Sequence, residues 1–111
     1  MLLCHVLDGQ AWAAALASGS HAPAALARDG FLHCCTEEQL AFVLGRHFPD
    51  RAGLLVLRFD PARSGAELRW VRSEPDQAPF PHLHGALPVA CVVDVRPVSY
   101  THLTLPTKRI V

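Results

Sequence analysis

The chain of 111 residues is long enough for one hydrophobic core and too short for two domains. Ten basic side chains balance ten acidic ones, so no basic excess is present to bind the phosphate backbone of DNA. No apolar run approaches the length of a transmembrane helix, and the start MLLCHVLDGQAW is too polar for a signal peptide. We therefore expect a cytoplasmic protein without a DNA or membrane partner, in which the four cysteines remain thiols.

The first quarter of the chain predicts a strand followed by two short helices. Residues 2–7 form a short apolar run typical of a strand, and Asp8 is well placed to cap the next element. Residues 10–17 are rich in alanine and favour a helix, which a serine-glycine-serine stretch ends. Residues 23–28 predict a second helix, with Gly30 as its C-terminal glycine.

The central part predicts a strand, a helix and a second strand. Residues 31–35, from the stretch GFLHCC, read as a strand, and Thr36 with Gln39 resembles a capping box. The helix that follows carries apolar residues at helical spacing and ends at Phe48-Pro49. Residues 54–60 (LLVLRFD) predict a buried strand that Pro61 closes.

Two further strands are predicted in the last third, with a histidine-containing stretch between them. Residues 67–72 alternate apolar and charged side chains, as in a half-exposed strand, and residues 89–95 predict the final strand. The stretch FPHLHG at 80–85 is flanked by prolines that fix the backbone, and Gly85 permits a close approach or a positive φ. We expect a rigid turn here, which either holds its histidines at fixed geometry or leaves them facing solvent.

The C-terminal stretch VSYTHLTLPTKRIV resembles the translation of a transposase-end adapter used in sequencing libraries. We therefore interpret residues 98–111 as sequencing-adapter read-through and residues 1–97 as a single domain. The alternative is a genuine strand with a polar tail, because valine, tyrosine and threonine favour strands.

The order of a histidine near the N-terminus, Trp12, the GFLHC block, Gln39, the LLVLRFD and ELRW strands and FPHLHG resembles domain-of-unknown-function family 952. That family is grouped by fold with ADP-ribosyltransferase-like domains, which include NAD-using transferases and RNA 2′-phosphotransferases. The resemblance implies a small single α+β domain with a mixed or antiparallel sheet and two to three helices. It also implies an ADP-ribosyltransferase-like pocket for a small molecule that contains ribose or phosphate, with NAD as the candidate cofactor.

Carried onto this sequence, the resemblance implies a cleft shared by His5, His33 and His82. His5 and His82 would hydrogen-bond ribose or phosphate, and His33 would act as a general acid or base because histidine titrates near neutrality. We therefore predict His33 and His82 as catalytic residues of an ADP-ribosyl- or phosphotransferase-like enzyme. The predicted ligand-binding residues are His5, Trp12, Gln39, Trp70 and Gly85.

One departure from the family pattern bears directly on catalysis. Val71 stands where a glutamate commonly follows the tryptophan, and many such transferases use a carboxylate to steady the ribose cation. Glu67 or Glu74 would have to replace it. Two readings therefore stay open: a transferase, or a non-catalytic binding or interaction domain that keeps the same pocket.

A zinc site is the remaining alternative. Side chains two residues apart lie on the same face of a strand. His82 and His84 would therefore share one face, and His33 and Cys35 would share another. These four ligand types suit tetrahedral zinc, although Cys35 and His84 are themselves departures from the family pattern and no CxxC or HExxH motif is present. The other three cysteines are interpreted as small buried hydrophobes: Cys4, Cys34 and Cys91.

Overall fold

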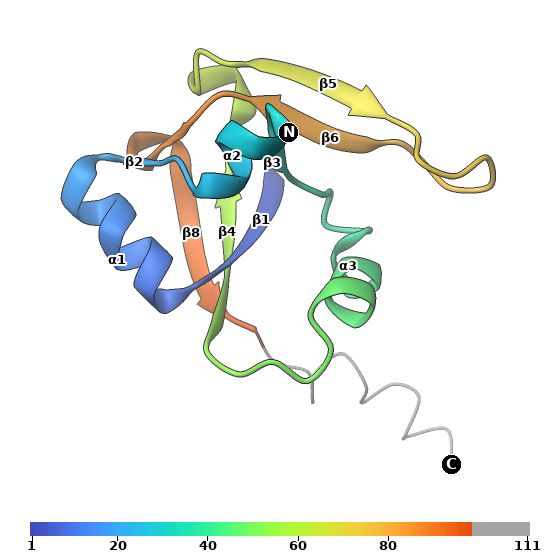
Figure 1. Ribbon diagram of the computed structural model, residues 1–111, viewed down its shortest axis with the longest axis horizontal. Coiled ribbons are helices and arrows are strands. Elements are labelled where there is room, and N and C mark those ends of the chain that lie inside the picture. The colour runs from blue at the N-terminus through green and yellow to red at the C-terminus, as the bar shows by residue number, and fades with distance from the viewer. Residues whose placement is uncertain (99–111) are drawn as a thin grey trace.

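Three helices and three small antiparallel sheets make up residues 1–98, the part of the chain that the computed structural model describes (Figure 1). The predicted α+β class is confirmed, but the expected single sheet is divided into three. The helices are α1 (Gly9–Ser18), α2 (Ala24–Asp29) and α3 (Leu40–His47). The strands are β1 (Leu3–Asp8), β2 (Ser20–His21), β3 (Leu32–His33), β4 (Leu54–Phe59), β5 (Glu67–Val71), β6 (Phe80–His84), β7 (Leu87–Pro88) and β8 (Val92–Pro97).

The main sheet has the order β1-β4-β8, and apolar side chains cover both of its faces. The alternation of side chains along β1 sends Leu3 to the larger core, where it packs with Leu57 and Phe59. Cys4 points to the opposite face and packs with Val56, against α3. This two-sided burial explains why LLVLRFD is almost continuously apolar.

The histidine-containing stretch FPHLHG forms β6, the central strand of the sheet β3-β6-β5, so the predicted turn was wrong. Alternation buries Pro81 and Leu83 and directs His82 and His84 to the other face. Pro81 has no backbone N–H to donate, but its carbonyl oxygen accepts a hydrogen bond from the Cys34 N–H at 3.2 Å. A proline is tolerated here because β3 ends at His33, so the missing donor of Pro81 removes no hydrogen bond from the β3–β6 ladder.

The predicted strand over residues 31–35 is shared between two sheets. Its first half is β3, which pairs with β6 through Leu32 and His33. Its end forms an isolated antiparallel bridge between Cys35 and Cys4 at the free edge of β1. The stretch Leu32–Cys35 therefore connects the sheet β3-β6-β5 to the main sheet.

Hydrogen bonds and backbone angles confirm the predicted cap of α1 and the glycine that ends α2, whereas α3 begins only at Leu40, after the predicted capping box. Asp8 Oδ1 accepts a hydrogen bond from the Ala11 N–H at 2.7 Å, and Gly30 ends α2 with a φ of 84°. Thr36 and Gln39 form the reciprocal capping box: each backbone N–H donates to the other side chain, at 3.0 and 3.2 Å. Short-range signals thus located the start of α1 and the end of α2 well.

The last predicted strand begins later than expected. A 3-10 turn at Val89–Cys91 precedes β8, because the Cys91 carbonyl oxygen accepts a hydrogen bond from the Asp60 N–H at 3.0 Å. Most of the predicted adapter segment, residues 99–111, lies outside the described part of the chain. No helix within residues 1–98 is long and apolar enough to span a membrane.

Candidate functional site

A cavity of about 600 Å³ lies where the Leu32–Cys35 stretch joins the two larger sheets. Three of the predicted site residues line it: His5 from β1, His33 from β3 and His82 from β6. His33 and His82 are directly opposite each other in the ladder, and their ring centroids are 5.6 Å apart. The three predicted histidines therefore line one cavity, and their catalytic and binding roles stay predictions.

His5 forms the buried side of the cavity, and its exposed fraction is only 9%. Its Nδ1 lies 2.7 Å from the carbonyl oxygen of His33, and since a carbonyl oxygen only accepts, Nδ1 must carry the proton. Burial lowers the pKa of His5 to about 4, so the ring is neutral near pH 7 and Nε2 holds a free lone pair.

The Nε2 atom of His5 must also reach solvent. Among the described residues, every fully buried side-chain nitrogen or oxygen has a hydrogen-bond partner. Nε2 of His5 has no such partner, so this atom is not fully buried. His5 is therefore an acceptor presented to the cavity, for a ligand group that donates a hydrogen bond.

Phe31 organises the histidines on the opposite side. Its ring stacks on His82 with a centroid distance of 3.9 Å and an interplanar angle of 9°. The rings of His33 and His84 lie 4.7 and 5.6 Å from it. Burial, followed by the charges of His33 and His84, lowers the pKa of His82. The result is a planar, mainly neutral stacking surface beside the cavity.

His33 is the most accessible of the three histidines, with 65% of its side chain exposed. Its Nε2 lies 3.3 Å from Oδ2 of Asp29 at the end of α2. Hydrogen bonds from Arg28 and then from His33 lower the pKa of Asp29, so this carboxylate is charged. An exposed imidazole oriented by a carboxylate has the arrangement that acid–base catalysis requires.

Helix α3 adds apolar and cationic side chains that the sequence reasoning did not identify. Phe42, Val43, Arg46 and His47 all line the cavity. The Arg46 guanidinium lies 5.9 Å from the centre of the Phe42 ring, one helical turn away. The i, i+4 spacing of these two residues was visible in the sequence, but the docking of α3 against β1 was not.

Of the two glutamates that could replace the missing family carboxylate, only Glu74 lines the cavity. Glu67 is engaged on β5, where it accepts a 2.7 Å hydrogen bond from Arg69. Glu74 lies in the connection between β5 and β6 and lines the cavity together with Ser73 and Gln77.

The other predicted ligand-binding residues do not line this cavity. Trp12 packs against the larger core, and Trp70 lies exposed on the edge strand β5. Gln39 holds the capping box and donates from Nε2 to the Pro79 carbonyl oxygen at 3.0 Å. Gly85 allows a close approach instead: a Cβ at this position would lie 2.8 Å from Cβ of Ala66. Trp12, Gln39 and Gly85 therefore have structural roles that explain their residue types, whereas nothing in the structure explains the exposed Trp70.

The four residues of the zinc alternative do not converge. Cys35 is buried against Cys4, whereas His33, His82 and His84 gather around Phe31. Within residues 1–98, no group of three or more histidine, cysteine or acidic side chains has an arrangement that could hold a metal ion. The strand alternation was applied correctly, but the stretch leaves its sheet between His33 and Cys35.

Comparison with known proteins agrees with the fold. Residues 6–95 match a family described as protein of unknown function (DUF952). The chain belongs to this family. The resemblance inferred from GFLHC and FPHLHG is thus confirmed at the level of the DUF952 family, and the ADP-ribosyltransferase-like grouping stays a prediction.

The solved structures similar to this DUF952 chain come from Caulobacter crescentus. The crystal structure of protein CC0527 has a TM-score of 0.77 at 28% identity, over 94% of this chain and 99% of that one. The solution NMR structure of CC0527 has a TM-score of 0.72 at 29% identity, over 88% and 84%. No curated protein is significantly similar to the chain.

Proposed function

We propose that the cavity binds a small molecule that carries a ribose-like hydroxyl and an anionic group, such as NAD or a related ribose phosphate, in a cytoplasmic protein with an ADP-ribosyltransferase-like pocket. The observation that carries this proposal is the fixed protonation of His5. Its neutral ring offers Nε2 as an acceptor, which suits a sugar hydroxyl and not a phosphate oxygen. This assigns ribose, rather than phosphate, to His5.

The rest of the lining supports a nucleotide-like ligand. The stacked pair of Phe31 and His82 offers a flat surface to a base or nicotinamide ring. Arg46 and His47 stand at the α3 side, and no carboxylate of residues 1–98 forms an ion pair with Arg46. An unpaired guanidinium is well suited to a phosphate.

Thermal unfolding with ligands tests this proposal. NAD, ADP-ribose and AMP should raise the melting temperature, because a ligand bound only to the folded state stabilises it. His5→Ala should remove the shift, whereas the control His84→Ala should keep it, since His84 adjoins Phe31 without lining the cavity.

A second comparison isolates the hydroxyl group. The unchanged protein should prefer a ribonucleotide to its dideoxyribonucleotide counterpart, and His5→Ala should lose this preference. No shift with any nucleotide would reject the proposal and favour a non-catalytic interaction domain.

Transfer chemistry is the second candidate, and the contact between His33 and Asp29 favours it. His33 would take a proton from an acceptor hydroxyl, and Glu74 would face the ribose cation as nicotinamide leaves. Nicotinamide release from NAD, followed by chromatography, tests this step. His33→Gln and Glu74→Gln should each stop nicotinamide release but keep the thermal shift with NAD. If the unchanged protein binds NAD without releasing nicotinamide, the transfer reaction is rejected and the binding proposal stands.

A further inference from the structure

Cys4 and Cys35 face each other across the edge of the main sheet. The Cys4 N–H donates to the Cys35 carbonyl oxygen at 2.7 Å, and the Cys35 N–H donates back at 2.9 Å. This reciprocal pair defines a hydrogen-bonded antiparallel position, in which the two side chains lie on the same face of the sheet. Both side chains belong to the same small core cluster, together with Val56.

The spacing of such a pair suits a disulfide. Residues at hydrogen-bonded antiparallel positions have Cα atoms about 5.5 Å apart. Disulfides join Cα atoms that are about 4.4–6.8 Å apart. Both cysteines are free thiols in this structure and both line the cavity, although their exposed fractions are only 0% and 2%. A reagent would therefore have to be small and to come through the cavity.

We propose that Cys4 and Cys35 are a modification site, at which a hydroperoxide that enters the cavity converts the two thiols into a reversible disulfide. This inference goes beyond the proposed ligand and does not depend on it. It also revises the interpretation of Cys4 as only a small hydrophobe, an interpretation that the structure leaves intact for Cys34 and Cys91, both buried in the larger core.

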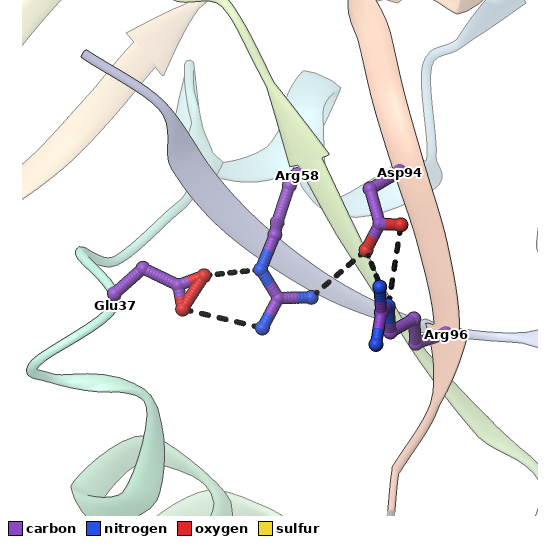
Figure 2. Close-up of polar contacts among 4 residues, drawn as sticks. All are labelled: Glu37, Arg58, Asp94 and Arg96. Atoms are coloured by element: carbon purple, nitrogen blue, oxygen red, sulfur yellow. Dashed lines mark hydrogen bonds and ion pairs between the residues drawn. The ribbon is translucent and has the colours of Figure 1, made fainter.

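The surroundings of Cys4 favour its role as the attacking sulfur. Arg58 lies opposite Cys4 on β4, so Cys4 stands between Arg58 and Cys35. Figure 2 shows that Arg58 is held from both sides, by Glu37 and by Asp94. The pKa of Cys4 is lowered, mostly by the neighbouring Cys35 thiol; burial and then Glu37 raise it, and Arg58 lowers it.

The reaction balances in two steps. The Cys4 thiolate attacks one peroxide oxygen, an S–O bond forms, the O–O bond breaks, and the leaving hydroxide takes up a proton to become water. The Cys35 sulfur then attacks the sulfenic sulfur of Cys4, the S–S bond forms, and the S–O bond breaks with release of a second water. The two thiols lose two electrons in total, and hydrogen peroxide is reduced to water.

The site also suits reduction back to thiols. A disulfide is reduced when a thiolate attacks one of its sulfurs, so a small thiol that enters the cavity can restore both cysteines. The crosslink would join the Leu32–Cys35 stretch covalently to β1, at the base of the cavity.

Peroxide treatment of the full chain, followed by thiol counting and peptide mass spectrometry, tests the proposal. The number of titratable thiols should fall from four to two, and dithiothreitol should restore it. Trypsin cuts after Arg28 and Arg46, so a Cys4–Cys35 bond joins two different peptides, with a mass lower by two hydrogen atoms. Cys35→Ser should abolish this linked species.

The neighbouring cysteine supplies the matched control. Cys34 also lines the cavity, but its side chain packs into the larger core and burial raises its pKa to about 12. Cys34→Ser should still form the linked species, its mass changed only by the substitution, because Cys34 lies in the same tryptic peptide as Cys35. Circular dichroism of both serine variants checks that they fold. Retention of all four thiols after peroxide treatment, a link that requires Cys34, or a link only between separate chains would each overturn the proposal.

Discussion

The two sides of the cavity place the same residue type in opposite environments. His5 and His33 are joined by one hydrogen bond of 2.7 Å, yet His5 is 9% exposed and 65% of the His33 side chain is exposed. The β1 side is largely buried: Nδ1 of His5 is already bonded to the His33 carbonyl oxygen, and Nε2 is left for a ligand. The β3–β6 side is open, and its rings can still exchange protons with solvent and ligand. One pocket can thus use the buried His5 to bind a ligand and the exposed His33 to transfer a proton.

The largest expected effect concerns the buried side and its response to acid. The pKa of His5 falls from 6.5 to about 4 on folding, so between these pH values the unfolded state binds a proton that the folded state does not. Stability should therefore decrease as the pH falls from 6.5 to 4, by about 3 kcal/mol from His5. His21, which packs 5.0 Å from His5 and whose burial lowers its pKa, adds to the same trend.

Urea unfolding at several pH values measures this dependence. His5→Gln should flatten the loss of stability between pH 6.5 and 4, whereas His33→Gln on the open side should leave it in place. Equal slopes for the unchanged protein and His5→Gln would show that the two sides do not differ in this way.

The next effect concerns the close packing of Gly85, just after β6, against Ala66. Gly85→Ala would place a methyl group 2.8 Å from Cβ of Ala66, and such overpacking costs about 1–3 kcal/mol. Gly45, inside α3, has nothing within 4 Å of the same added atom, so Gly45→Ala should stabilise the protein by about 0.5–1 kcal/mol. Equilibrium unfolding of both variants would detect the opposite signs, and two shifts of the same sign would contradict the packing described for Gly85.

The charge beside Cys4 permits a more sensitive test of the buried side. Glu37 raises the pKa of Cys4, so Glu37→Gln should increase the thiolate fraction and speed disulfide formation several-fold. Asp94→Asn is the control, because Asp94 also contacts Arg58 but does not act on Cys4. Alkylation at successive times after peroxide addition gives the rate of disulfide formation. A slower reaction in Glu37→Gln would contradict the effect described for Glu37.

The smallest effect is expected at the end of the described chain. We propose that residues 98–111 are adapter read-through, so a chain ending at Val98 should melt within a few degrees of the full chain, in keeping with surface changes of about 0.5 kcal/mol. Removing Val98 as well should cost somewhat more, because its N–H donates to the Leu54 carbonyl oxygen at 2.9 Å and its side chain packs near Cys4. A loss of ten degrees or more on removal of 99–111, against the few expected, would identify the tail as native.

Local signals in the sequence predicted the three helices and the strands β1 and β4, because each depends on residues a few positions apart. They failed where distant partners decide the structure. The prolines of FPHLHG suggested a turn, but pairing on both sides holds it as a strand. The histidines were found because they interrupt apolar runs, whereas Arg46 and the contact between Cys4 and Cys35 required the docking of α3 and of residues 32–35.

The pairing of β1 with β4 has a consequence for biosynthesis. β1 ends at Asp8, but its partner begins only at Leu54, and Cys35, its other neighbour, also comes later in the chain. At synthesis rates of about 5–20 residues per second, the ribosome completes β4 several seconds after β1. During that interval the apolar strand that carries Cys4 and His5 has no sheet to join. The nascent chain must therefore keep this segment from aggregating until its partner strand emerges.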